Sequence, residues 1–239
     1  MKKTLLVAAV ALSALFAGSA AMAGDFAYNI GVQSDYVWRG VSQNNDQAAL
    51  QGGIDYKHGL FYAGTWLSNV DFAGANGTHA NTEWDLYAGI DPTVGDWSFN
   101  FGAYYYTYPN TSNVTFGELQ ADVSHSWGKG TIGINTFTPI NTLERPYVEI
   151  AASYPLTDKL SISGALGDCG GDASNSNSSN ASHCNGVTAG YTTWNAGLTY
   201  ALTSVISLDV RYSENSMSAR EVNGSLAAPK VYATLKASF

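Results

Sequence analysis

The feature that most limits the fold of this chain is a strict alternation of apolar with small or polar residues. Trp97, Phe99 and Phe101, for example, are separated by Ser98 and Asn100. A period of two places the two sets on opposite faces of a β-strand. Twelve segments follow this pattern, and we expect each to be a strand. They are residues 26–36, 47–57, 60–69, 82–91, 96–106, 115–125, 129–137, 146–154, 158–167, 191–201, 205–214 and 230–239.

The connections between these segments alternate in length, which predicts an up-and-down antiparallel arrangement. Five short turns, such as the one at residues 57–59, interleave with six longer connections. An even number of strands brings the last one antiparallel to the first, so the sheet can close without a free edge. The sequence therefore predicts an all-β fold, a closed antiparallel barrel of about twelve strands. The longer connections are residues 37–46, 70–81, 107–114, 138–145, 168–190 and 215–229.

The N-terminal residues 1–23 have the features of a cleaved signal peptide. Lys2 and Lys3 precede an apolar run over residues 5–17, and Ala21-Met22-Ala23 resembles a signal peptidase site. A transmembrane anchor is the alternative, but this run is short of the roughly 20 residues that a spanning helix needs. We expect residues 24–239 to form the barrel after bacterial export.

A soluble β-sandwich would also alternate, so the composition has to decide what covers the apolar faces. Only 13 % of the residues are charged, against about 25 % in average soluble proteins. The non-apolar positions carry mainly Gly, Ser, Thr, Asn, Gln and Tyr, which suits the inside of a barrel better than a solvated surface. A transmembrane barrel surrounded by lipid is the favoured interpretation.

Aromatic residues gather near the ends of the expected strands, which is typical of the interfacial bands of membrane barrels. Near the short turns they are Tyr56, Trp97, Tyr154 and Tyr200. Near the longer connections they are Tyr36, Trp38, Trp84, Tyr106, Tyr147 and Tyr212.

The last segment has apolar residues at every second position from Val231 and ends on Phe239. This resembles the C-terminal signal by which the barrel assembly machinery recognises outer-membrane barrels. We therefore expect the assembly machinery and outer-membrane lipid as partners, and the outer membrane of a Gram-negative bacterium as the location.

Several motifs resemble the TorF family of porins. The most specific is Ser-Asp-Tyr-Val-Trp-Arg-Gly-Val-Ser-Gln at residues 34–43, and further similar stretches occur over most of the chain. The resemblance implies an outer-membrane barrel with a role in transport. The other matching stretches are residues 51–56, 61–70, 83–89, 116–119 and 154–158 and the last strand.

The polar faces of the strands carry more acidic than basic residues, and we expect them to line the bore. Twelve strands lie between the filled interior of eight-stranded barrels and the open channel of sixteen-stranded ones. Passive diffusion of small polar solutes with a bias toward cations is the predicted function. The alternative is that these groups pair with one another and seal the bore of a structural or surface-receptor barrel. The pore-lining candidates are Asp55, Glu83, Asp85, Glu118, Asp122, Glu149, Asp209, Arg211 and Lys236.

Arg39 stands within the most specific motif, at the end of the first expected strand. It is a candidate for the pore mouth, where it would pair with Asp35 or with an acidic residue of the lumen. An arginine at the rim that contacts lipid headgroups is an equally good interpretation.

Cys169 and Cys184 flank a Gly-, Ser- and Asn-rich stretch within one long connection. Export to an oxidising compartment predicts a disulfide between them. Two unpaired thiols are the alternative, and a metal site with His183 has too few ligands. We expect no metal and no cofactor.

The remaining function classes find little support in the sequence. The net charge of −8 argues against nucleic acid as a partner. A hydrolase would need a nucleophile, a base and an orienting group in one place, and the sequence has no Gly-x-Ser-x-Gly elbow, no His-Glu-x-x-His motif and no phosphate loop. We therefore expect no catalytic residues, and a hydrolase active at the rim of the barrel is the less favoured alternative.

Overall fold

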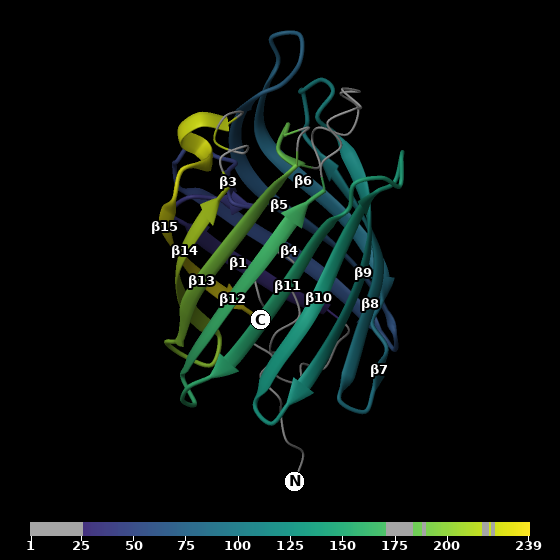
Figure 1. The fold of residues 1–239 in the computed structure, drawn as a ribbon, viewed down its shortest axis with the longest axis vertical. Coiled ribbons are helices and arrows are strands. Elements are labelled where there is room, and N and C mark those ends of the chain that lie inside the picture. Colours follow the sequence, from purple (N-terminus) through teal and green to yellow (C-terminus); the bar gives the residue numbers. More distant parts are fainter. Residues whose placement is uncertain (1–25, 171–183, 188–189, 217–219, 221–222) are drawn as a thin grey trace.

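The computed structural model describes residues 26–170, 184–187, 190–216, 220 and 223–239. The expected signal peptide lies outside these residues, as do His183 and the centre of the connection between the two cysteines. Twelve long strands make up the wall of a barrel (Figure 1). They are β1 (Phe26–Gln33), β4 (Ala49–His58), β5 (Phe61–Ala73), β6 (His79–Ile90), β8 (Trp97–Thr107), β9 (Phe116–Trp127), β10 (Gly130–Pro139), β11 (Tyr147–Pro155), β12 (Leu160–Cys169), β13 (Tyr191–Ala201), β14 (Ile206–Asn215) and β15 (Lys230–Ser238).

The sheet closes on itself at the junction between the first and last strands. β1 pairs antiparallel with β4 on one side and with β15 on the other, and Asn29 stands opposite Ser238 in that register. β6 pairs directly with β8, and the two-residue β7 (Thr93–Val94) belongs to the turn between them. Every other long strand pairs with its neighbours in sequence, so the predicted fold class, a closed up-and-down barrel, is confirmed.

The outside of the barrel carries apolar side chains on every strand. Ile30, Leu50, Leu86, Leu166 and Val210 are between 46 % and 59 % exposed, while the residues next to them in each strand point inward. An outer face of this kind is the one that membrane barrels present to lipid. None of the helical turns in the described part of the chain has the length and hydropathy needed to cross a bilayer.

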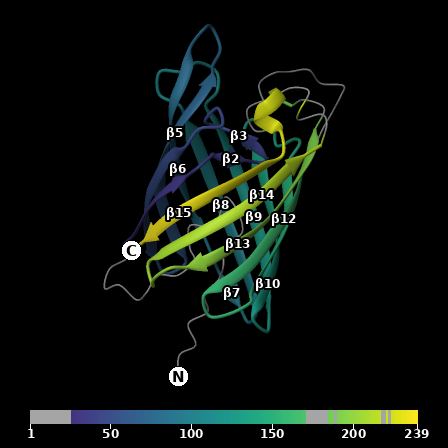
Figure 2. The same ribbon diagram turned by 90° about the vertical axis from the view of Figure 1, so that its left-hand side faces the viewer.

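The barrel has two unlike ends, which we call the turn end and the loop end. The turn end carries the short connections, and the loop end carries the longer ones. Phe239 lies at the turn end, where its backbone exchanges hydrogen bonds with Tyr28. Its role as an assembly signal stays a prediction. At the loop end β5 and β6 rise above the rest of the rim (Figure 2), because most of residues 70–81, expected to be a loop, continue the two strands past a register shift between Asn69 and Phe72.

The aromatic band at the turn end is confirmed, since all four of its residues are at least 39 % exposed on the outer face. The band at the loop end is only partly correct. Trp84 is 44 % exposed, and Tyr212 contacts the ring of the exposed Trp194. The other four members face the inside of the barrel and are no more than 7 % exposed. They are Tyr36, Trp38, Tyr106 and Tyr147.

Candidate functional site

The connection after β1 does not stay at the rim but turns into the barrel. β1 ends at Gln33, three residues earlier than expected, and residues 35–42 are all buried. They form a hairpin of β2 (Val37–Trp38) and β3 (Val41–Ser42). Arg39 and Gly40 make its turn with φ of 46° and 76°, the left-handed backbone that two-residue hairpin turns require. We call residues 34–48 the inner hairpin.

The inner hairpin crosses the bore to the opposite wall. Around the ring of twelve strands, β9 is the fifth and β10 the sixth strand from β1. The guanidinium of Arg39 binds Glu118 on β9 and lies 5.2 Å from the ring centre of Phe137 on β10. An arginine anchored among headgroups at the rim is therefore wrong, and the partner of Arg39 is a lumen acid rather than Asp35.

Arg39 occupies a closely fitted receptor on the wall. Its Nη1 and Nη2 donate to Oε1 and Oε2 of Glu118 over 2.8 and 2.9 Å, a two-point charge-assisted pair. The guanidinium carbon lies 4.2 Å from the ring centre of Trp38 and 4.3 Å from that of Tyr147. The hydroxyl of Tyr106 donates to Oε2 of Glu118 over 3.1 Å. Glu118 has no exposed surface, so its negative charge is compensated by these partners and not by water.

The backbone of the turn is bound as well as the arginine side chain. The amide Nδ2 of Asn215 on β14 donates to the carbonyl of Gly40, and the hydroxyl of Tyr191 on β13 donates to the carbonyl of Arg39 over 3.0 Å. A Cβ at position 40 would collide with the side chains of Asn215 and Thr193. Glycine is thus required there both for the positive φ and for the close approach to the wall.

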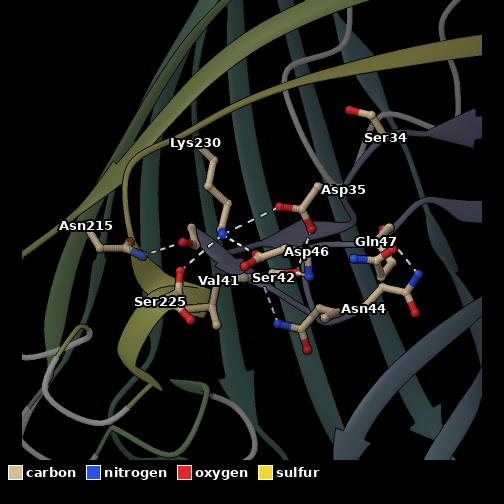
Figure 3. A network of polar contacts seen from close by, with 12 residues as sticks. Ser34, Asp35, Val41, Ser42, Asn44, Asp46, Gln47, Asn215, Ser225 and Lys230 are labelled. Carbon is tan, nitrogen blue, oxygen red and sulfur yellow. Dashed lines mark hydrogen bonds and ion pairs between the residues drawn. The ribbon is translucent and has the colours of Figure 1, made fainter.

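A network around Lys230 holds the base of the inner hairpin at the loop end (Figure 3). Nζ of Lys230 pairs with Asp46 and lies 3.7 Å from Oδ2 of Asp35. The hydroxyl of Ser42 donates to Oδ1 of Asp35 over 2.6 Å and accepts the backbone N–H of Asp46 over 2.9 Å. Burial raises the pKa of the Asp35 carboxyl, and the Ser42 hydrogen bond and the Lys230 charge oppose that rise. The network therefore ties both arms of the hairpin to the start of β15.

The short segment 184–187 contacts the inner hairpin from the loop end. Nδ2 of Asn185 donates to the carbonyl of Trp38 over 3.3 Å, and Nε2 of Gln43 donates to Oδ1 of Asn185 over 2.9 Å. Cys184 forms a disulfide with Cys169, the last residue of β12. The disulfide thus fixes the segment 184–187, which contacts the inner hairpin, to the barrel wall.

Removing this disulfide should loosen the segment 184–187. The two cysteines are 15 residues apart in sequence. In the chain-entropy model, closing a loop of that length raises the free energy of the unfolded state by about 3 kcal/mol. We expect the double variant Cys169→Ser/Cys184→Ser to have a lower Tm and more frequent current fluctuations in a planar bilayer. Dithiothreitol should do the same to the unaltered protein and nothing further to the variant. An unchanged Tm and unchanged fluctuations would contradict the role of the disulfide.

The predicted pore-lining residues all point inward, but many are engaged with one another. Asp209 lies 3.0 Å from Nη2 of Arg211, and Lys236 interacts electrostatically with Asp55. The hydroxyl of Tyr87 donates to Asp55. Both interpretations of the sequence, polar lining and internal pairing, therefore describe part of the bore.

Two acids next to the inner hairpin, Glu83 and Asp85, each have a buried carboxyl oxygen that accepts no hydrogen bond from the described residues. Oε1 of Glu83 accepts a 3.4 Å hydrogen bond from the hydroxyl of Tyr36. Oε2 of Glu83 and Oδ1 of Asp85 are buried and have no hydrogen-bond partner among the described residues. No group of three or more metal-ligating side chains occurs in the described residues. Glu83 and Asp85 thus place two incompletely hydrogen-bonded acidic side chains close to the hairpin.

A cavity lies against the tip of the inner hairpin. Its lining comes from Trp38 and Arg39 on the hairpin and from Tyr104, Glu149 and Tyr232 on the wall. Glu149 accepts hydrogen bonds from Tyr147 over 2.9 Å and from Asn135 over 3.2 Å. The inner hairpin thus narrows the bore, and its Trp38 belongs to a buried cluster that also contains Tyr104 and Tyr106 of the wall.

The sequence interpretation missed the inner hairpin, although one signal for it was present. Arg39-Gly40 lies between the apolar pair Val37-Trp38 and Val41, and a glycine at the second turn position is typical of a two-residue hairpin turn. The same motif, residues 34–43, is the part that most resembles a known family. Its conspicuous residues are the ones that fold into the bore.

Comparison with known proteins places the chain in a family and supports the fold. A family model described as "Bacterial protein of unknown function (Gcw_chp)" matches residues 17–239. A comparison with curated protein sequences finds no match. A solved structure titled "KdgM porin" has a TM-score of 0.57 at 8 % identity, over 90 % of this chain and 97 % of that chain. A structure of "KdgM porin in complex with disordered oligogalacturonate" gives a TM-score of 0.53 at 8 % identity, with the same coverage. The chain therefore belongs to the Gcw_chp family of bacterial proteins and has a porin-like β-barrel fold.

Proposed function

We propose that this protein is an outer-membrane channel for the passive diffusion of small polar solutes, that it favours cations, and that the inner hairpin narrows its bore. The apolar outer face on every strand supports a location in lipid. The resemblance of the motifs to the TorF family of porins and the likeness of the fold to the KdgM porin support a transport role.

The observation that carries the proposal is a charged, hairpin-narrowed bore. Seven acidic side chains of the wall face the inside, against the basic Arg211, Lys230 and Lys236 of the wall and Arg39 of the inner hairpin. An excess of carboxylates in a narrow passage with low-dielectric walls concentrates cations and repels anions. The acids are Asp55, Glu83, Asp85, Glu118, Asp122, Glu149 and Asp209.

Single-channel recording of the purified barrel in a planar bilayer tests both parts of the proposal. We expect discrete current steps, and a reversal potential in a KCl gradient that corresponds to preferred passage of K⁺. A silent barrel would contradict the channel and favour the second candidate, a sealed structural or surface-receptor barrel, which the anchoring of the inner hairpin across the bore would explain. A preference for Cl⁻ would contradict the charge argument alone.

The double variant Glu83→Gln/Asp85→Asn should weaken the preference for cations. Both acids lie beside the inner hairpin, so the field of any charge they carry acts on an ion that passes the hairpin. We expect the permeability ratio of K⁺ to Cl⁻ to fall by about twofold. The control Asp158→Asn removes an exposed charge at the turn end and should leave the ratio unchanged. Equal ratios in the two variants would show that the acids do not act on permeating ions.

A further inference from the structure

The wall of the barrel holds Arg39 in the way that a binding protein holds a guanidinium ligand. A buried carboxylate meets both terminal nitrogens, and aromatic rings lie over the guanidinium carbon. The wall contributes Tyr106 from β8, Glu118 from β9, Phe137 from β10 and Tyr147 from β11. Four adjacent strands thus build the receptor, and only Trp38 comes from the hairpin itself. We call these four wall residues the guanidinium receptor.

The receptor matches a cation much better than an anion or a neutral solute. Glu118 interacts electrostatically with Asp85, and Arg39 interacts electrostatically with Glu149 as well. Aromatic faces attract cations through the quadrupole of the ring. A planar group with two parallel N–H donors adds a two-point hydrogen bond that a spherical ion cannot make.

We propose that the guanidinium receptor is a binding site for organic cations that pass through the bore, and that it prefers guanidinium over ammonium groups. Arg39 and such a solute use the same atoms of Glu118, so they exclude one another. Withdrawal of the inner hairpin empties the site, and a bound solute keeps the hairpin from returning. The proposal rests on the proposed channel for the route by which a solute reaches the site.

Competition inside the unaltered protein strongly favours Arg39, because the hairpin holds its guanidinium next to the receptor. Even a flexible tether gives an effective concentration on the order of millimolar, and this hairpin is also anchored by Lys230 and Asn215. The site is therefore best examined in a protein that lacks the internal guanidinium.

The experiment uses Arg39→Ala in a planar bilayer, with methylguanidinium as the probe. We expect the probe to block the current, since it occupies the receptor and narrows the bore again. In Arg39→Ala/Glu118→Gln, where the carboxylate is lost, the half-blocking concentration should rise by about tenfold. Methylammonium, which lacks the planar pair of donors, should block Arg39→Ala only at higher concentration. Equal block of both variants by methylguanidinium, or equal block of Arg39→Ala by the two probes, would overturn the proposal.

A second readout separates this site from the channel. Millimolar methylguanidinium, far below denaturing concentrations, should raise the Tm of Arg39→Ala in detergent relative to the same concentration of sodium, and should leave that of Arg39→Ala/Glu118→Gln unchanged. If Arg39→Ala does not fold alone, the probe should increase its refolded yield. A raised Tm or yield in a barrel that carries no current would support the guanidinium-binding site and contradict the proposed channel. A barrel that conducts, but in which methylguanidinium changes neither the Tm nor the yield and causes no selective block, would support the channel and contradict the guanidinium-binding site.

Discussion

Replacement of Arg39 by alanine should increase the single-channel conductance of the purified barrel by roughly threefold or more, given the width that a twelve-stranded wall encloses. Arg39 is the contact by which the tip of the inner hairpin reaches the opposite wall. Removing one partner of a buried ion pair costs about 3–5 kcal/mol, because the remaining charge stays buried without compensation. Glu118 regains water only if the hairpin withdraws, so the undocked arrangement becomes favoured.

The same variant should keep the barrel intact, because the strands pair through their backbones. The migration of heated and unheated samples in detergent gels and the β-sheet signal in circular dichroism check this point. Lys57→Ala is the matched control, since it removes an exposed ion pair with Asp91 at the turn end and should leave the conductance unchanged. If Arg39→Ala folds and conducts no more than the unaltered protein, the inner hairpin does not limit the current.

The barrel itself was predictable because the alternation within each strand shows which of its residues face outward and which face the bore. Leu86 and Val210 both face outward. The alternation along a single segment is enough to place such residues, because no contact with other strands has to be known. The inward set, including Asp85 and Arg211, follows from the same period. Strand number and closure then follow from counting the segments and from the need to leave no free edge.

The inner hairpin was not predictable in the same way, because its position depends on contacts far away in sequence. Glu118 is 79 residues from Arg39, and no local pattern links the two. Aromatic residues at a strand end, such as Tyr36 and Trp38, suit both a lipid interface and a buried cluster. The period of two continues through Tyr36, so the segment resembled an extension of the first strand until the tertiary contacts placed it in the bore.

Pairing inside the bore was equally hidden from the sequence. Asp209 and Arg211 lie on the same strand, and their contact could be inferred from a spacing of two. The contact of Lys230 with Asp46, in contrast, depends on which strands become neighbours when the barrel closes. The sequence therefore predicted which residues face the bore but not which of them remain available to a solute.

Gly40→Ala should release the inner hairpin with Arg39 still in place. The new methyl group would overlap Asn215 and Thr193 on the wall, and the positive φ of 76° adds backbone strain. Overpacking of this kind costs about 1–3 kcal/mol, and left-handed backbone at a non-glycine residue adds about 1–2 kcal/mol. We expect an increase in conductance that approaches that of Arg39→Ala, measured in the same bilayer.

Gly59→Ala separates the effect of contact from the effect of strain. Gly59 has a similar φ of 61°, in the turn between β4 and β5, but none of the described residues has an atom within 4 Å of the Cβ that it would gain. This variant therefore carries the backbone strain without the collision, and its conductance should equal that of the unaltered protein. Equal conductance in both glycine variants would mean that the wall yields to the methyl group at position 40, and that the close approach of the turn to Asn215 does not hold the hairpin in the bore.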